Sequence, residues 1–323
     1  MKVFVTRKIP NRGIEMLRAA GHEITMSPHD RVLTPEELTA GGVGVDAVMT
    51  QLTDKITREV LEAWKPSVKI VANYAVGYDN IDTTAAKDLG ILITNTPDVI
   101  NDTVSEHTFA LMLAIAHRVV EGDKFMRAGK YHAWEPELLL GTDISGKVLG
   151  ILGLGRIGSK VAHHGVKGFG MKAFYYDVRR NENFEKEVGA EFRETPEEIF
   201  KEADFISVHV PLMDSTRHLV NAERLGMMKP TAYLINTSRG PVVDEHALAE
   251  ALRKNVIKGA ALDVFVNEPT MEPLLRDLDN VIVTPHIASA TEEARQKMGE
   301  VAAGNILAVL AGKGSTTPVS IQS

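Results

Sequence analysis

Three side chains suited to acid–base chemistry and anion binding follow apolar, strand-like runs in the last third of the chain. Arg239, Glu268 and His286 each lie within a few residues of the end of such a run. Ligands of open α/β sheets bind beyond the carboxyl ends of the parallel strands, so the three are predicted to share one sheet edge. Taken singly, each has a simpler explanation: a surface ion pair, a solvated turn, or a hydrogen-bonded structural histidine.

A glycine-rich turn, residues 153–158 (GLGRIG), provides the second chemical signal. It follows the apolar run 148–152 and precedes a helical pattern, an arrangement that directs helix N-terminal amides at a pyrophosphate. We expect Gly153 to turn the chain, Gly155 to let the backbone approach phosphate, and Gly158 to let helix and strand pack closely. A lone match to this pattern is weak, but its position between a strand and a helix favours dinucleotide binding.

Asp177 ends the next predicted strand, about 20 residues beyond the glycines, where a carboxylate can bind ribose hydroxyls. A 2′-phosphate about 4 Å from that carboxylate would be repelled by about 4 kcal/mol at an effective dielectric of about 20. The sequence therefore favours NADH. NADPH stays possible, because Arg179 or Arg180 could neutralise a phosphate, although two arginines on a solvated loop are an equally good explanation.

Short apolar runs alternate with longer amphipathic segments, which predicts an α/β fold of parallel sheets covered by helices. Residues 34–37 (TPEE) carry an N-cap, a proline at N1 and a glutamate at N3, and so predict a helix start. Ten strands are expected, in two series, at 2–6, 46–50, 69–72 and 91–94, then at 148–152, 173–177, 205–210, 232–236, 259–264 and 281–284.

The two series are separated by a segment without strand signals. Residues 101–120 form one long helical pattern that opens with cap-type residues, and residues 121–143 are expected to form a projecting arm. A last helix is expected over residues 291–310.

Composition excludes several classes of protein. The 323 residues exceed a single core, so two domains are expected. A net charge of -7 offers no broad surface for nucleic acid, and the apolar run 109–116 is far shorter than the roughly 20 residues of a membrane span. Without cysteine there is no disulfide or thiolate metal site, no metal is expected, and the cytoplasm is the default location.

Six motifs distributed over almost the whole chain resemble those of the D-isomer-specific 2-hydroxyacid dehydrogenases. Within that family the resemblance is strongest to glyoxylate/hydroxypyruvate reductases, through NYAVGYDNID and, less specifically, WEPELLLGTDISGK (134–147). The six are NYAVGYDNID (73–82), GLGRIG (153–158), HVPLMDSTRHLVN (209–221), INTSRGPVVDE (235–245), ALDVFVNEP (261–269) and TPHIAS (284–289).

The resemblance assigns roles to the three residues at the sheet edge. As a hydride reaches the carbonyl carbon, the oxygen must receive a proton, and an imidazole such as His286 can exchange one near neutrality. Glu268 would stabilise the imidazolium form. Arg239 would hold the substrate carboxylate and polarise the carbonyl. Backbone amides of the loop Ala75-Val76-Gly77 would also bind the carboxylate, with Leu52, and less firmly Tyr74 and Trp134, as pocket walls.

The resemblance also implies the domain organisation and the cofactor contacts. A substrate-binding domain with a flavodoxin-like sheet would comprise residues 1–99 and 288–323, and a Rossmann domain residues 100–287, with catalysis in the cleft between them. Family members are usually homodimers through the helix and arm at about 101–143. Expected cofactor contacts are Gly153, Leu154, Gly155, Arg156, Ile157, Gly158, Asp177, Val178, Arg179, His209, Pro211, Thr216, Thr237, Ser238, Asp263 and Ala288.

Two alternatives remain open at this stage. One is another dehydrogenase of this family, acting on 3-phosphoglycerate or D-lactate. The other is a non-catalytic, dinucleotide-sensing protein, since corepressors resembling these enzymes keep the fold. Trp134 could border a partner subunit's pocket, but packing within its own subunit is the simpler expectation. The preferred 2-oxoacid cannot be read from the sequence, because one methylene changes discrimination by only about 1–3 kcal/mol.

Overall fold

The computed structural model describes residues 1–319, which fold into two compact units. Unit 1 contains residues 1–100 and the segment from 290 onward, and unit 2 contains residues 101–289. The boundaries implied by the family resemblance lie after residue 99 and before residue 288. Residues 320–323, the end of the expected C-terminal segment, lie outside the described residues. The chain thus contributes to unit 1 from both of its ends.

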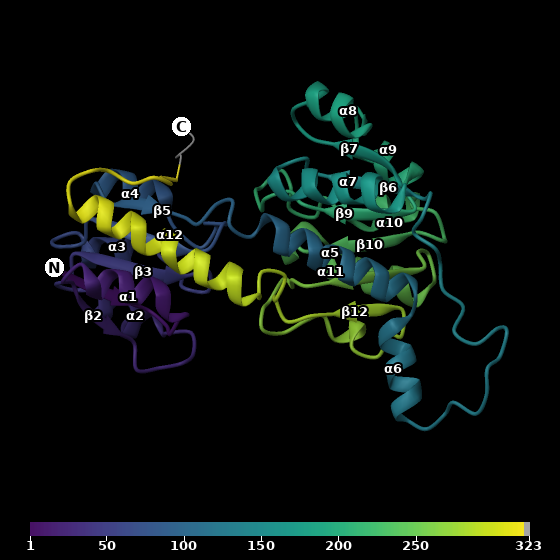
Figure 1. The fold of residues 1–323 in the computed structure, drawn as a ribbon, viewed down its shortest axis with the longest axis horizontal. Coiled ribbons are helices and arrows are strands. Elements are labelled where there is room, and N and C mark those ends of the chain that lie inside the picture. Colours follow the sequence, from purple (N-terminus) through teal and green to yellow (C-terminus); the bar gives the residue numbers. More distant parts are fainter. Residues whose placement is uncertain (320–323) are drawn as a thin grey trace. The chain divides into compact units, whose positions relative to one another are not determined.

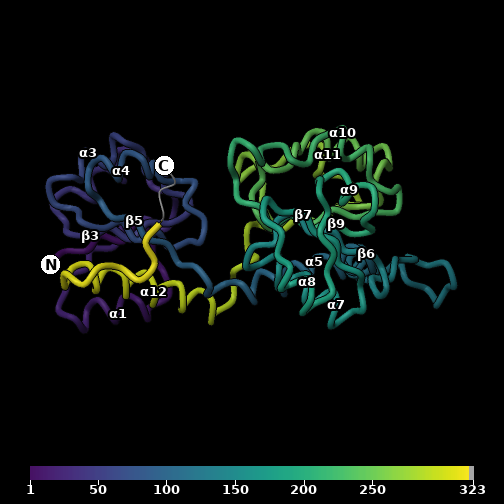
Figure 2. The backbone as a smooth tube through the Cα atoms, turned by 90° about the horizontal axis from the view of Figure 1, so that it is seen from above, coloured from purple at the N-terminus to yellow at the C-terminus, as the bar shows by residue number. Residues whose placement is uncertain are grey.

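Unit 1 is built on a five-stranded parallel sheet of order β2-β1-β3-β4-β5. This is the flavodoxin-like order, as predicted. Helices α1 and α12 cover one face of the sheet and α3 and α4 the other (Figure 2). The strands are β1 (Lys2–Val5), β2 (Glu23–Met26), β3 (Ala47–Gln51), β4 (Ile70–Tyr74) and β5 (Leu92–Thr94), and the helices are α1 (Asn11–Ala19), α2 (Pro35–Gly42), α3 (Arg58–Trp64), α4 (Thr83–Leu89) and α12 (Glu292–Leu310).

Local sequence signals explain where the helices of unit 1 begin. The Oγ1 atom of Thr34 accepts a hydrogen bond from the Glu37 backbone N–H, and the Glu37 carboxylate accepts one from the Thr34 N–H. This is the capping box predicted from residues 34–37. The Thr291 side chain caps the start of α12 by accepting from the Ala294 N–H. Strand β2 was not predicted, because its short, mostly exposed sequence EITM lacks the apolar run of a buried strand.

Unit 2 contains a seven-stranded parallel sheet of order β12-β11-β10-β9-β6-β7-β8, in which the Rossmann order is extended by one strand (Figure 1). The sequence predicted six of the seven and missed the two-residue edge strand β8. The strands are β6 (Val148–Leu152), β7 (Lys172–Tyr176), β8 (Glu191–Phe192), β9 (Phe205–Val208), β10 (Tyr233–Asn236), β11 (Gly259–Leu262) and β12 (Val281–Val283).

Helices cover both faces of this sheet, with α5, α7 and α8 on one face and α9, α10 and α11 on the other (Figure 2). Each face has its own apolar core. The helices are α5 (Asn101–Ala116), α6 (Val119–Arg127), α7 (Arg156–Phe169), α8 (Glu182–Val188), α9 (Pro196–Glu202), α10 (Ala222–Met227) and α11 (Glu245–Arg253), with short 3-10 turns at Gly240–Val242 and Pro273–Leu275.

The prediction of a single long helix over residues 101–120 is wrong. Helix α5 ends at Ala116, and Arg118, with φ 55°, precedes α6 in the left-handed region. A non-glycine residue in that region cannot continue a right-handed helix, so the chain turns there. Residues 128–147 continue as an extended segment with turns. Within the described residues, every helix is too short or too polar to cross a membrane.

Candidate active site

The glycine-rich turn connects β6 to α7 as predicted. Gly153 has φ 94°, which glycine adopts readily, and its N–H donates to the Tyr176 carbonyl at 2.9 Å. A Cβ on Gly158 would lie 2.1 Å from the Gly153 carbonyl oxygen, so only glycine allows this packing. A Cβ on Gly155 would meet no atom within 4 Å. The N-terminus of α7 therefore faces open space that an anionic group could enter, and the turn fits a dinucleotide pyrophosphate.

Asp177 is held against the glycine turn. One carboxylate oxygen accepts from the Leu154 N–H at 2.7 Å and the other from the Arg179 N–H at 3.1 Å. The next side chain, Val178, is 88% exposed. Such exposure of an apolar side chain beside a fixed carboxylate suits the flat apolar face of an adenine base.

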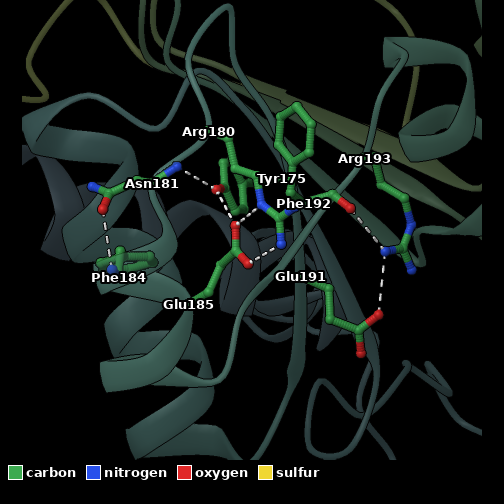
Figure 3. A network of polar contacts seen from close by, with 8 residues as sticks. All are labelled: Tyr175, Arg180, Asn181, Phe184, Glu185, Glu191, Phe192 and Arg193. Atoms are coloured by element: carbon green, nitrogen blue, oxygen red, sulfur yellow. Dashed lines mark hydrogen bonds and ion pairs between the residues drawn. The ribbon is translucent and has the colours of Figure 1, made fainter.

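Of the two arginines that could bind a 2′-phosphate, Arg180 lies in a network of polar contacts with α8 (Figure 3). Arg180 forms a double hydrogen bond with Glu185, from Nε at 2.9 Å and from Nη2 at 2.8 Å. The Tyr175 hydroxyl donates to the same Glu185 at 2.7 Å, and it accepts from the Asn181 N–H at 2.8 Å. Glu185 therefore holds Arg180 toward α8. Both arginines are exposed, and Arg179 is the one whose backbone N–H bonds to Asp177.

Five further predicted cofactor residues, His209, Pro211, Thr216, Thr237 and Ser238, follow β9 and β10, which are neighbours in the sheet. A ring nitrogen of His209, Nε2, lies 2.8 Å from the Ser207 hydroxyl, and burial lowers the pKa of His209 to about 3. The Thr216 hydroxyl donates to the Pro211 carbonyl at 2.6 Å and shapes that turn. Beyond β10, the Thr237 hydroxyl lies 3.0 Å from that of Thr108.

Arg239 lies on a turn that a buried asparagine holds in place. Asn236, at the end of β10, donates from Nδ2 to the Arg239 carbonyl at 3.0 Å and accepts from the Ser238 N–H and hydroxyl. The following Gly240 is packed against the segment that leads to Glu268, since a Cβ there would lie 1.9 Å from the Phe265 carbonyl carbon. The arginine and glutamate segments are therefore in direct backbone contact.

His286 and Glu268, which are 18 residues apart in the chain, form a hydrogen-bonded pair. Nδ1 of His286 lies 2.9 and 3.1 Å from the two oxygens of Glu268. The side chains are 23% and 32% exposed. Burial alone would raise the pKa of Glu268, but the hydrogen bond from His286 and the positive charges of His286 and Arg239 outweigh it and lower that pKa. All three predicted catalytic residues therefore interact, with Glu268 at the centre.

Asp263 has a structural task that the sequence did not reveal. Its buried carboxylate accepts from the Ile287 and Ala288 N–H groups, each at 2.8 Å, and from the Thr284 hydroxyl at 2.6 Å. These bonds fix the turn in which His286 has φ 55°, a strained conformation for a non-glycine residue. Asp263 and Ala288 are also predicted cofactor contacts, and in the structure the bond between them helps to hold the turn that carries His286.

His107 of α5 completes this cluster, with Nε2 3.3 Å from the Thr284 hydroxyl and 3.6 Å from Asp263. No sequence signal separates it from an ordinary helix residue. Among the described residues, no group of three or more His, Asp or Glu side chains could hold a metal ion.

In the predicted substrate loop of unit 1, residues 75–77, every backbone carbonyl accepts a hydrogen bond from another group of unit 1. The carbonyls of Ala75, Val76 and Gly77 accept from the Thr96 N–H, Asn95 Nδ2 and Asn73 Nδ2, at 2.9, 2.7 and 3.0 Å. In a trans peptide the following N–H points away from the carbonyl, so the loop turns amide N–H groups outward. Leu52 is half-buried and follows β3.

Two residues suggested as pocket walls have other environments. Tyr74 is 2% exposed, and its hydroxyl donates to the Arg295 carbonyl of α12, so it supports helix packing. Trp134 is 79% exposed, so the simpler expectation that it packs within its own subunit is wrong.

Comparison with known proteins accords with this geometry. Residues 109–288 match the NAD binding domain of the D-isomer specific 2-hydroxyacid dehydrogenases. The chain is 48% identical to a glyoxylate reductase from Pyrococcus furiosus, over 97% of this chain and 93% of that protein.

Among solved structures, a protein from Thermus thermophilus is similar with a TM-score of 0.92 and 41% identity, covering 99% of this chain and 100% of that one. An NADPH-dependent glyoxylate/hydroxypyruvate reductase from Sinorhizobium meliloti, in complex with NADP and malonate, has a TM-score of 0.83 at 31% identity, covering 99% and 96%. Since the glycine turn and the Arg239–Glu268–His286 constellation occur within the matched region, the chain belongs to the D-isomer specific 2-hydroxyacid dehydrogenase family, whose members use NAD(P).

Proposed function

We propose that this protein reduces a small 2-oxoacid, glyoxylate or hydroxypyruvate, to the 2-hydroxyacid, as the D-isomer where the product is chiral. The observation that carries the proposal is the 2.9 Å pair between His286 Nδ1 and Glu268. The glyoxylate reductases to which the chain is 45–48% identical over nearly its full length support the substrate class.

The bound dinucleotide supplies the hydride, and the protein supplies the proton. With Nδ1–H of His286 engaged by Glu268, Nε2 carries the proton that passes to the carbonyl oxygen. The imidazolium becomes a neutral imidazole as the C–H and O–H bonds form. Because the pKa of Glu268 is lowered, this group is a carboxylate at neutral pH and stabilises the imidazolium before the transfer.

Arg239 and the backbone amides of the loop 75–77 are proposed to bind the substrate carboxylate. Arg239 provides a planar, permanently charged fork, and its charge also polarises the neighbouring carbonyl. The outward amides of the loop around Ala75-Val76-Gly77 provide further donors, and Leu52 is proposed as an apolar wall near that loop. The two groups lie in different units, and a catalytic cleft between the units stays a prediction.

NADH is the proposed preferred cofactor, because the fixed carboxylate of Asp177 disfavours a 2′-phosphate. We propose the cofactor contacts that the family resemblance implies, from Gly153 to Ala288. Both carboxylate oxygens of Asp263 already accept hydrogen bonds from the turn at 284–288.

We also propose that the protein is a cytoplasmic homodimer. Helix α6 and the extended segment after it expose six apolar side chains: Val119, Val120, Met126, Tyr131, Trp134 and Leu140. The exposure of so many large apolar side chains within residues 119–140 is typical of an interface, and a second copy of the chain is the occupant expected from the family resemblance. The absence of cysteine suits a reducing compartment.

The test is an assay with NADH and a panel of 2-oxoacids, followed at the nicotinamide absorbance band. We expect glyoxylate or hydroxypyruvate to give the highest kcat/KM, and His286→Ala to lower kcat by about 100-fold or more. His163→Ala, an exposed histidine of α7, is the matched control. If the unaltered protein turned over no faster than His286→Ala, a dinucleotide-sensing role would be favoured. If larger 2-oxoacids gave a higher kcat/KM than glyoxylate and hydroxypyruvate, the proposed substrate would be wrong, and the family assignment would be unaffected.

A further inference from the structure

A second carboxylate, Glu245, holds the segment that carries Glu268. It is the first residue of α11, is 7% exposed, and lies outside the group that the chemistry requires. One of its oxygens accepts from the Val266 N–H and the other from the Glu272 N–H, the latter at 3.2 Å. These two amides lie on either side of Glu268, so the ends of its loop are tied to one carboxylate.

Within the loop, further bonds fix Glu268 itself. The Phe265 N–H donates to the Glu268 carboxylate at 3.1 Å, and the Thr270 N–H donates to the Asn267 carbonyl at 2.8 Å. Glu268 thus points at His286 from a turn whose two ends depend on Glu245.

Burying the Glu245 carboxylate costs free energy, because the charged group loses its hydration. Packing alone does not explain why a carboxylate occupies this position. Burial raises its pKa, the two backbone donors lower it, and the carboxylates of Glu272 and Glu268 raise it again, with a net increase. His246 is the nearby basic side chain, 3.8 Å from Glu272. A neutral glutamine would avoid the desolvation penalty, but it has one acceptor oxygen and would turn an N–H₂ group toward the other amide.

We propose that Glu245 is a positioning residue that sets the Glu268–His286 pair by clamping both ends of the Glu268 loop. The inference rests on the proposed function, because it concerns the same acid–base pair. Glu245 touches neither substrate nor cofactor in this scheme, and it acts only through Glu268.

The experiment is a double-mutant cycle of Glu245→Gln and Glu268→Gln, measured as kcat with saturating NADH and glyoxylate. A misplacement of about 1 Å can cost about 100-fold, so Glu245→Gln alone is expected to lower kcat on the order of 10-fold. In the Glu268→Gln background it should cause no further loss, because the group it positions is already disabled. The matched control is Glu250→Gln on the same helix, where Glu250 pairs with Arg253 and Lys254.

A second readout separates positioning from stability. With Glu268 displaced, the imidazolium is less stabilised, so the high-pH limb of kcat/KM for reduction should move to lower pH in Glu245→Gln and stay in place in Glu250→Gln. NADH affinity, measured by fluorescence, should be unchanged in both variants.

The inference would be overturned if Glu245→Gln lost the same factor in both backgrounds, or if it kept the full rate and pH profile. A Glu268→Gln variant with undiminished activity would remove the proposed function first, and this inference with it.

Discussion

Gly240 leaves no room for a side chain beside the segment that leads to Glu268. A Cβ there would lie 1.9 and 2.1 Å from the Phe265 carbonyl carbon and oxygen, and backbone cannot yield as a flexible side chain can. We predict that Gly240→Ala displaces the Glu268 segment and lowers kcat on the order of 100-fold. Gly226→Ala is the matched control, because its Cβ would meet no atom within 4 Å. Equal activities of the two variants would contradict the prediction.

We predict that the free energy of unfolding depends on pH because of His209. Burial lowers its folded-state pKa to about 3, whereas an unfolded histidine titrates near about 6.5. Between those pH values the unfolded state binds more protons, so the free energy of unfolding falls as pH is lowered through this window.

Replacing His209 with glutamine should flatten that slope between about pH 6.5 and 4, as measured by urea unfolding without cofactor. The control is His163→Gln, an exposed histidine. A slope unchanged by His209→Gln would show that other groups cause the acid sensitivity.

The residue types of the site could be predicted from the sequence, but the residues that hold them could not. Arg239, Glu268 and His286 are recognisable because they follow strands that lie side by side. Asp263 and Glu245 are carboxylates whose tasks depend on amides brought to them by folding, at residues 287–288 and at 266 and 272. Such contacts have no local pattern, because the partner is a backbone group.

At the scale of elements, the connection between β7 and α8 carries Arg179 and Arg180, and a residue of α8 holds the second of them. Glu185 of α8 holds Arg180 by two hydrogen bonds (Figure 3). We predict that Glu185→Gln releases Arg180 and raises kcat/KM with NADPH several-fold, with little change for NADH. Glu187→Gln, an exposed residue of the same helix, should leave both values unchanged. A uniform loss with both cofactors would instead indicate a damaged helix.

Element prediction succeeded where a local signal exists and failed where tertiary contacts decide. Buried strands such as β6 are visible as apolar runs, and the start of α2 is visible by its cap. The edge strands β2 and β8 have four and two residues and depend on a neighbouring strand for their pairing. The break at Arg118 was also hidden, because residues 101–120 keep a helical pattern through the turn.

For the whole molecule, the exposed apolar side chains of α6 and the following segment predict association. We expect sedimentation equilibrium to give twice the mass of the chain, and Val119→Glu to shift the protein toward the monomer, because a charge would be buried at the interface. Val43→Glu is the matched control, since Val43 is 59% exposed and Val119 55%. A monomeric mass for the unaltered protein would contradict the prediction.

The two-part construction of unit 1 has a consequence for synthesis. Helix α12 packs on α1 so closely that Gly13 rests against Gly299, and Arg12 pairs with Glu300 at 2.8 Å. On the ribosome, the opening hundred residues emerge long before α12 does, and all of unit 2 is made in between. Unit 2 can thus finish folding first. Until α12 has been made, the surface of α1 that it covers stays exposed, and chaperones can bind there.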